Sequence, residues 1–328
     1  MNPFIYTRPA DTGAAIKSQS RGNQAFFLAG GTNLVDMMKM GVVVPEKIVD
    51  INRLPLRNIE AVQSGLRLGA LATNSEVADH PDVLKNYPLL SLAINAGASP
   101  QLRNMATVGG NLLQRTRCPY FFDLTMPCNK RAPGSGCGAL AGFNRMHALF
   151  GASDKCIAVN PSDMSVALAA LDAVVHVRGA GGDREIKFED FHRLPGDEPQ
   201  LDNTLAKGEL IMAVDLPPSA FTKHVHYLKV RDRSSYAFAL ISVAVALDLD
   251  KDNNIKDVRL AMGGVAHKPW RLRASEDFLK GRSATEDNFK QAAQIAMQGA
   301  KAYQYNQFKL KLAPNTILQA LKTASGQV

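Results

Sequence analysis

All four cysteines of this chain fall within one segment: Cys118, Cys128, Cys137 and Cys156. The surrounding residues, 114–160, are rich in Gly, Pro and small side chains and show no sustained helical or strand periodicity, so they predict a long loop. Loops of this length are uncommon in compact domains and are usually either functional or disordered. Four thiols concentrated in one such loop favour function, and the cysteines are candidate metal ligands.

The spacing of the cysteines, C-x9-C-x8-C-x18-C, does not identify the metal. It lacks the C-x2-C pair of zinc ribbons and bacterial ferredoxins, and four thiolates can ligate either zinc or an iron–sulfur cluster. Four cysteines among 328 residues are not the disulfide framework of a small secreted domain. Two disulfides that staple the loop are the remaining alternative, if the protein works outside the cytoplasm. The seven histidines are scattered and predict no ligand cluster.

Two glycine-rich turns precede the cysteines. The first, at 30–33 (Gly-Gly-Thr-Asn), joins an apolar strand at 25–29 to a helix that begins near residue 34. Strand, glycine turn and helix form a phosphate cradle, because backbone N–H groups and the helix start attract an anion. A single turn of this kind equally suits a plain tight turn. The second turn, at 106–111, adds donors and a hydroxyl group, and together the two fit a dinucleotide. Neither is G-x-G-x-x-G, so a Rossmann fold is not indicated.

Length and charge limit the function classes. A chain of 328 residues suggests two or three domains, and no apolar run approaches the roughly 20 residues of a membrane span. The first residues lack the regions of a signal peptide, so we expect synthesis in the cytoplasm, with export only as a passenger on another subunit. The net charge of +8 is dispersed and favours a solvated surface, or one that docks on an acidic subunit, over a nucleic-acid site.

The periodicity changes along the chain. The first part predicts helices at 11–20, 87–96 and 164–171 among short strands, and a domain boundary lies near Phe221. Beyond it, apolar or alternating stretches predict an antiparallel sheet. The expected strands are 225–230, 237–248 and 257–263. Two helices follow, one opened by a Ser283–Glu286 capping box and a last one at 314–324.

The motifs together resemble one known family. Tyr6-x-Arg8-Pro9, the turns at 28–34 and 103–111, and Pro161-Ser162-Asp163 are similar to the FAD-binding subunits of the xanthine dehydrogenase family of molybdenum hydroxylases. Residues 263–269 and 279–281 resemble that family's C-terminal flavoprotein domain. The resemblance implies an α+β fold, with a two-part FAD-binding domain of the PCMH/VAO type and a C-terminal α+β domain with an antiparallel sheet and helices. The implied boundaries are 1–58, 59–220 with the cysteine insertion at about 114–160, and 221–328.

The insertion departs from typical members of this family. It is similar to flavin subunits that carry an additional [4Fe–4S] cluster, as in aryl-CoA reductases and, more closely, periplasmic aldehyde oxidoreductases. The resemblance therefore selects iron–sulfur, with Cys118, Cys128, Cys137 and Cys156 as ligands.

The resemblance also implies the residues that contact FAD. The first turn would wrap the pyrophosphate, through Phe27, Leu28, Ala29, Gly30, Gly31, Thr32, Asn33 and Leu34. The opposite side would be held by Thr107, Gly110 and Asn111. Asp163 and Lys229 match family residues beside the cofactor, and Ile211 is a weaker match. Alternatively, Asp163 is only a helix N-cap, and Lys229 is a surface lysine on a strand.

The implied function is an electron-transfer subunit of a molybdenum-dependent aldehyde oxidoreductase, with no catalytic residues on this chain. It would form a heterotrimer with a [2Fe–2S] subunit and a molybdenum-cofactor subunit, in the periplasm by co-export with a twin-arginine-targeted partner, or in the cytoplasm. Members that reduce NAD carry acidic residues where this chain has Ser234-Ser235-Tyr236, so we expect another acceptor. The alternatives are the flavin subunit of an aryl-CoA reductase and a zinc-stabilised binding module.

Overall fold

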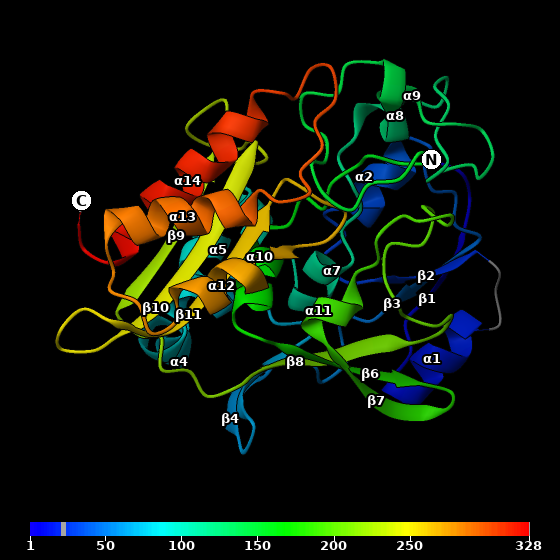
Figure 1. Ribbon diagram of the computed structural model, residues 1–328. Coiled ribbons are helices and arrows are strands. Elements are labelled where there is room, and N and C mark those ends of the chain that lie inside the picture. Colours follow the sequence, from blue (N-terminus) through cyan, green and yellow to red (C-terminus); the bar gives the residue numbers. More distant parts are fainter. Residues whose placement is uncertain (21–23, 328) are drawn as a thin grey trace.

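The computed structural model describes residues 1–20 and 24–327 of the chain. Three sheets follow one another along the sequence, as Figure 1 shows from the blue N-terminal part to the yellow and red C-terminal part. The first is a parallel sheet of three strands, the second an antiparallel sheet of five, and the third an antiparallel sheet of four. In the described residues, no helix has both the length and the apolar character needed to cross a membrane.

The first sheet has the order β1-β3-β2 and leads into the first glycine turn. Its elements are β1 (Ile5–Thr7), α1 (Thr12–Ser20), β2 (Ala25–Leu28), α2 (Leu34–Lys39) and β3 (Lys47–Asp50). The predicted helix at 11–20 forms, and the Asp11 carboxylate accepts a hydrogen bond from the Ala14 amide at 2.7 Å, as an N-cap does. The turn at 30–33 therefore lies between the end of β2 and the start of α2.

The second sheet has the order β4-β5-β8-β6-β7 and supports the second glycine turn. Its strands are β4 (Ile59–Val62), β5 (Gly65–Gly69), β6 (Val174–Gly179), β7 (Gly182–Lys187) and β8 (Leu210–Leu216). Its helices are α3 (Asn74–Asp79), α4 (Pro81–Asn86), α5 (Pro88–Ala96), α6 (Pro100–Arg103), α7 (Val108–Leu112), α10 (Asp163–Ala170) and α11 (Phe188–Phe191). Thr107 caps α7, because its Oγ1 accepts from the Gly110 amide at 3.2 Å.

The third sheet packs between two layers of helices. It has the order β12-β11-β10-β9. Its elements are β9 (His224–Val230), β10 (Ile241–Leu249), β11 (Ile255–Gly263), β12 (Trp270–Arg271), α12 (Arg273–Leu279), α13 (Glu286–Ala296) and α14 (Lys309–Ala324). Alternate side chains of β10 enter two cores: Ala244 and Ala246 join the core of α5 and α10, whereas Val243 and Val245 join that of α13 and α14. These features confirm the predicted α+β fold and its C-terminal sheet-and-helix domain.

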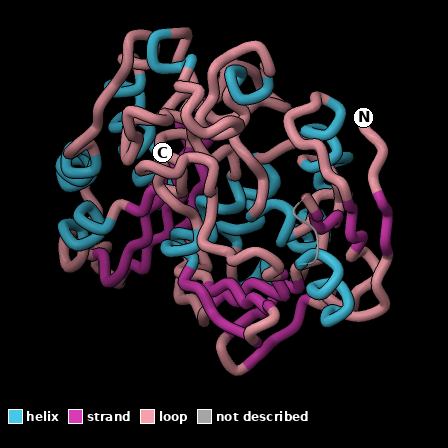
Figure 2. Tube along the Cα trace, turned by 90° about the vertical axis from the view of Figure 1, so that its right-hand side faces the viewer, coloured by secondary structure: helices cyan, strands magenta, loops and turns pink. Residues whose placement is uncertain are grey.

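Residues 114–160 contain only two short helices, α8 (Pro119–Phe122) and α9 (Gly138–Ala141), so the predicted long loop is present. Figure 2, turned by 90° from Figure 1, shows in pink that loops make up a large part of the chain. All four cysteines are free, which removes the alternative of two stapling disulfides.

Three of the expected elements are wrong in detail. The N-cap of α13 is Thr285, whose side chain accepts from the Asn288 amide, whereas the Ser283 hydroxyl bonds to Asn254. Strand β10 begins at Ile241 rather than at residue 237. Helix α14 begins at Lys309 and includes Pro314, because the buried Lys309 amine anchors its first turn to the carbonyl oxygens of His147 and Gly264. A local pattern cannot reveal such distant partners.

Candidate functional site

The two glycine turns lie directly against each other. A Cβ atom at Gly30 would lie 1.7 Å from the carbonyl oxygen of Met105, so only glycine fits there. Gly31 has φ +74, a left-handed conformation that glycine adopts without strain. The second turn is fixed in turn by backbone hydrogen bonds, among them Asn74 N to Ala106 O at 2.8 Å. The close approach brings both turns to one cavity.

This cavity has a volume of about 640 Å³, within the range of ligand sites, and we call it the flavin cavity after the cofactor that the sequence led us to expect there. Six of the residues predicted to bind the cofactor line it: Thr32, Asn33, Gly110, Asn111, Asp163 and Lys229. The other predicted residues are not part of this lining. They are Phe27, Leu28, Ala29, Gly30, Gly31, Leu34, Thr107 and Ile211. Ile211 is buried in β8 and packs against the second glycine turn: a Cβ atom built at Gly109 would lie 3.7 Å from the Cβ atom of Ile211.

The lining of the flavin cavity fits a polar cofactor. The Nδ2 atom of Asn33 and the Oδ1 atom of Asn74 are buried without hydrogen-bond partners, and both residues line the cavity. Buried polar atoms are almost always paired in native proteins, so these two require a ligand or water. Neither Asn74 nor the lining residue Arg103 is among the predicted contacts. Dinucleotide chemistry, with phosphates and hydroxyls, suits this set of donors and acceptors.

Asp163 and Lys229 join the third sheet to α10 at the cavity wall. The Lys229 amine lies 2.7 Å from the Asp163 carboxylate, and the Tyr227 hydroxyl donates to the same carboxylate at 2.8 Å. Burial and the charge of Asp163 raise the pKa of Tyr227 well above its usual value. Both alternatives for these residues are wrong: Ser162 is the N-cap of α10, and the Lys229 side chain is only 4% exposed.

Tyr236 and Phe238 lie at the edge of the flavin cavity between β9 and β10. Tyr236 is 58% exposed yet lines the cavity, and its φ of +50 is uncommon for a bulky side chain. Arg233 donates from two nitrogens to the Tyr236 carbonyl oxygen and so fixes this turn. An aromatic ring held in this place can cover one face of a bound ring system.

The four cysteines converge on one small cavity, the cysteine cavity, which all of them line. Cys128 and Cys137 are neighbours across an isolated antiparallel bridge. Burial raises the pKa of Cys118 to about 11, whereas the hydrogen bond with Cys156 lowers that of Cys137 to about 6. Among the residues 1–20 and 24–327, no group of three or more His, Cys, Asp or Glu side chains could hold a metal ion as it stands.

Two histidines also contact these thiols, although the scattered histidines predicted no such role. His147 Nε2 lies 3.2 Å from the Cys118 sulfur, and His267 Nε2 lies 3.2 Å from the Cys156 sulfur. Burial, and next the nearby Lys309, lowers the pKa of His147 to about 4. Burial, and next Lys130, lowers that of His267 to about 3. Sequence separations of 29 and 111 residues leave no local signal for either contact.

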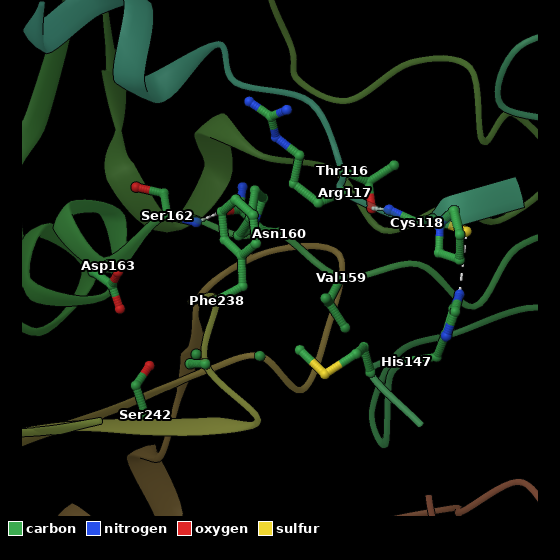
Figure 3. Close-up of a pocket in the computed structure, with 16 residues that line it drawn as sticks. Thr116, Arg117, Cys118, His147, Val159, Asn160, Ser162, Asp163, Phe238 and Ser242 are labelled. Carbon is green, nitrogen blue, oxygen red and sulfur yellow. Dashed lines mark hydrogen bonds between the residues drawn. The ribbon is translucent and has the colours of Figure 1, made fainter. Parts of the chain in front are cut away.

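A third cavity, of about 130 Å³, shares lining residues with both the cysteine cavity and the flavin cavity. Its lining includes Cys118 and His147 at one end and Ser162, Asp163 and Phe238 at the other. Figure 3 shows Asp163 and Cys118 on opposite sides of this space, with the Cys118 sulfur directed at His147. A group bound by the cysteines and a group in the flavin cavity would thus be neighbours.

The chain matches two families in succession. Residues 2–219 match the family described as "FAD binding domain in molybdopterin dehydrogenase". Residues 226–324 match "CO dehydrogenase flavoprotein C-terminal domain".

Two curated relatives and one solved structure are similar over most of their length. The aldehyde oxidoreductase FAD-binding subunit PaoB of Escherichia coli (strain K12) is 48% identical over 330 residues, covering 100% of both chains. The glyceraldehyde dehydrogenase medium chain of Sulfolobus acidocaldarius is 28% identical over 291 residues, covering 88% of this chain and 85% of the relative. A carbon monoxide dehydrogenase of Hydrogenophaga pseudoflava has a TM-score of 0.77 at 24% identity, covering 100% and 99%, and this likeness concerns the fold alone.

Proposed function

The chain belongs to the FAD-binding subunits of the molybdenum hydroxylases, which are oxidoreductases, and we propose that it is the FAD- and [4Fe–4S]-containing electron-transfer subunit of an aldehyde oxidoreductase. The observation that carries the proposal is the cavity between the four cysteines and the flavin cavity. The aldehyde substrate is proposed from the full-length similarity to the subunit named for that activity. Electrons would arrive from a [2Fe–2S] subunit and leave to an external acceptor.

FAD would lie in the flavin cavity and supply the capacity to exchange one or two electrons. This chain's residues would bind and orient it. Thr32 and Asn33 would hold the polar part through backbone N–H groups and the free Asn33 Nδ2. Gly110 and Asn111 would border it, because their own N–H groups already bond to Thr107. The other predicted residues of the first turn, together with Thr107, would not contact FAD directly but would hold the two turns in position. The Asp163–Lys229 pair would border the ring, with Ile211 packed beneath the second turn.

The second cofactor would be held by Cys118, Cys128, Cys137 and Cys156. Support comes from the convergence of four free thiols on one enclosed space, which is the donor set of a [4Fe–4S] cluster. The buried Lys130, whose side chain is 2% exposed, adds positive charge near the thiolates.

The acceptor proposed is a protein, a quinone or oxygen rather than NAD. Tyr236 supports this, because its ring stands at the cavity edge where a nicotinamide would need access to the flavin. The proposed partners are a [2Fe–2S] subunit and a molybdenum-cofactor subunit, in a heterotrimer. We also propose a periplasmic location, reached with a twin-arginine-targeted partner. Co-expression with and without that partner, followed by cell fractionation, tests the location.

We propose the domain boundaries near residues 58 and 220. The first lies just before β4 begins at Ile59, and the second lies between β8 and β9. Limited proteolysis of the isolated chain, with mass spectrometry of the fragments, tests both boundaries.

The central experiment is cofactor analysis of the complex, co-expressed and purified without oxygen. We expect FAD and the iron of one additional cluster on this chain, and no zinc. Cys128→Ser should lose that iron and keep FAD, since the thiol belongs only to the cysteine cavity. The matched control is Ser135→Ala, which removes the hydroxyl that accepts from the Cys128 amide at 3.0 Å but keeps the thiol. Zinc in the wild-type protein, or iron retained in Cys128→Ser, contradicts the proposal.

A further inference from the structure

Two histidines from distant parts of the chain occupy equivalent places at the cysteine cavity. His147 comes from the cysteine segment itself and His267 from the loop between β11 and β12. Each is buried, 2% and 8% exposed, and each places Nε2 3.2 Å from one cysteine sulfur. The duplication is informative, because two different cysteines, Cys118 and Cys156, are contacted in the same way from two elements.

The hydrogen-bond pattern fixes the direction of these contacts. The Nδ1 atoms of both imidazoles are buried and have no hydrogen-bond partner. A neutral imidazole carries one N–H, and a buried N–H without an acceptor costs more than a buried nitrogen lone pair without a donor. A cysteine thiolate can only accept, so with the cysteines deprotonated as cluster ligands the imidazole proton belongs on Nε2.

The backbone of His147 is held firmly at this place. Its carbonyl oxygen accepts from the Lys309 amine at 3.0 Å and from the Asn306 side-chain amide at 3.2 Å, and its own amide donates to Asn144 at 3.1 Å. For His267, the preceding residue is fixed by Asn160, whose amide donates to the Ala266 carbonyl oxygen at 2.9 Å. The backbone that carries each ring is thus held by the surrounding chain.

We propose that His147 and His267 are positioning residues that donate an Nε2–H hydrogen bond to the thiolates of Cys118 and Cys156 and thereby raise the reduction potential of the [4Fe–4S] cluster. This inference rests on the function proposed above. An added electron increases the negative charge on the thiolate sulfurs, and hydrogen bonds donated to them stabilise that form.

The test compares variants of each histidine in the complete complex, purified without oxygen. His147→Leu and His267→Leu remove the donor, and we expect a more negative midpoint potential in a dithionite titration followed by electron paramagnetic resonance. His147→Gln and His267→Gln keep an amide N–H near the same place and should recover part of the shift. The control is His192→Leu, which removes an equally buried imidazole that is bonded to the Leu112 carbonyl oxygen, away from the cysteines.

The outcomes separate this inference from the proposed function. Absence of iron in the wild-type protein defeats the proposed function, whatever the histidines do. A normal cluster with an unchanged potential in both Leu variants overturns the inference alone.

A second measurement covers Leu variants that fail to assemble. Wild-type protein labelled with 15N-histidine should show nitrogen couplings to the reduced cluster in pulsed paramagnetic resonance. Their absence also overturns the inference.

Discussion

The flavin cavity and the cysteine cavity are neighbours, yet the chain builds them in different ways. The flavin cavity lies where the two glycine turns meet. Backbone hydrogen bonds hold the turns, for example the bond from Val35 N to Gly31 O at 2.9 Å. The cysteine segment, residues 114–160, has almost no regular structure, and buried ion pairs supplement its scattered backbone hydrogen bonds. Arg115 and Lys130 both pair with Asp202, at 2.6 Å and 2.5 Å, between β7 and β8.

The difference shows what each region depends on. The flavin cavity depends on the absence of side chains at its turns, so small steric changes there should be severe. The cysteine segment depends on a few buried charges that pair over long sequence distances. One residue links the two: the Asn33 side-chain oxygen accepts from the Arg115 amide at 3.1 Å, while its Nδ2 stays free in the flavin cavity.

The largest effect is expected for Gly30→Ala. The added Cβ atom would overlap the Met105 carbonyl oxygen, so the two turns must separate. We expect loss of FAD and destabilisation by about 3 kcal/mol, the upper part of the usual range for overpacking. Flavin absorbance of the purified protein and urea unfolding measure the two effects.

The control is Gly181→Ala, since a Cβ atom at that exposed turn would meet nothing within 4 Å. It should leave flavin content and stability unchanged. Stoichiometric FAD in Gly30→Ala would show that contact between the two turns is not what shapes the flavin cavity.

A smaller effect, confined to the other region, is expected for Asp202→Ala. It leaves Lys130 buried without its carboxylate partner, and breaking a buried pair in this way costs on the order of 3 kcal/mol, less where water can enter. The Asp202 side chain is 26% exposed, so we expect about 2 kcal/mol. Iron should be lost more readily than in the wild type, while FAD is kept.

Asp197→Ala is the matched control. Asp197 pairs with Lys155 at 2.9 Å but is 90% exposed, and such pairs contribute about 0–1 kcal/mol. Equal losses of stability in the two variants would argue that the cysteine segment does not depend on the buried charge at Asp202.

The same contrast explains what the sequence could predict. The strand, turn and helix at 25–39 are set by local patterns, so the first turn and its place at a cavity could be predicted from the sequence. Lys229 and Asp163 were predicted as separate cofactor contacts, but their ion pair spans 66 residues and depends on β9 and α10 both packing against α5. His147 and His267 could not be found, because only the folded chain brings them to the cysteines.

The smallest effect is expected at Lys309, whose buried amine bonds to the carbonyl oxygens of His147 and Gly264 in the wall of the third cavity. Burial, and next the nearby Arg145, lowers its pKa from 10.5 to about 7, so the folded protein releases this proton before the unfolded chain does. Between these two values the unfolded chain binds more protons, and stability therefore rises with pH. The contribution is at most about 1.4 kcal/mol from pH 7 to pH 8. Lys309→Met should flatten the dependence of the urea unfolding free energy on pH in this window, whereas Lys311→Met, at an exposed position two residues further on, should retain it. A steep rise that persists in Lys309→Met would mean that another group titrates, and that the charge of this amine does not set the pH dependence.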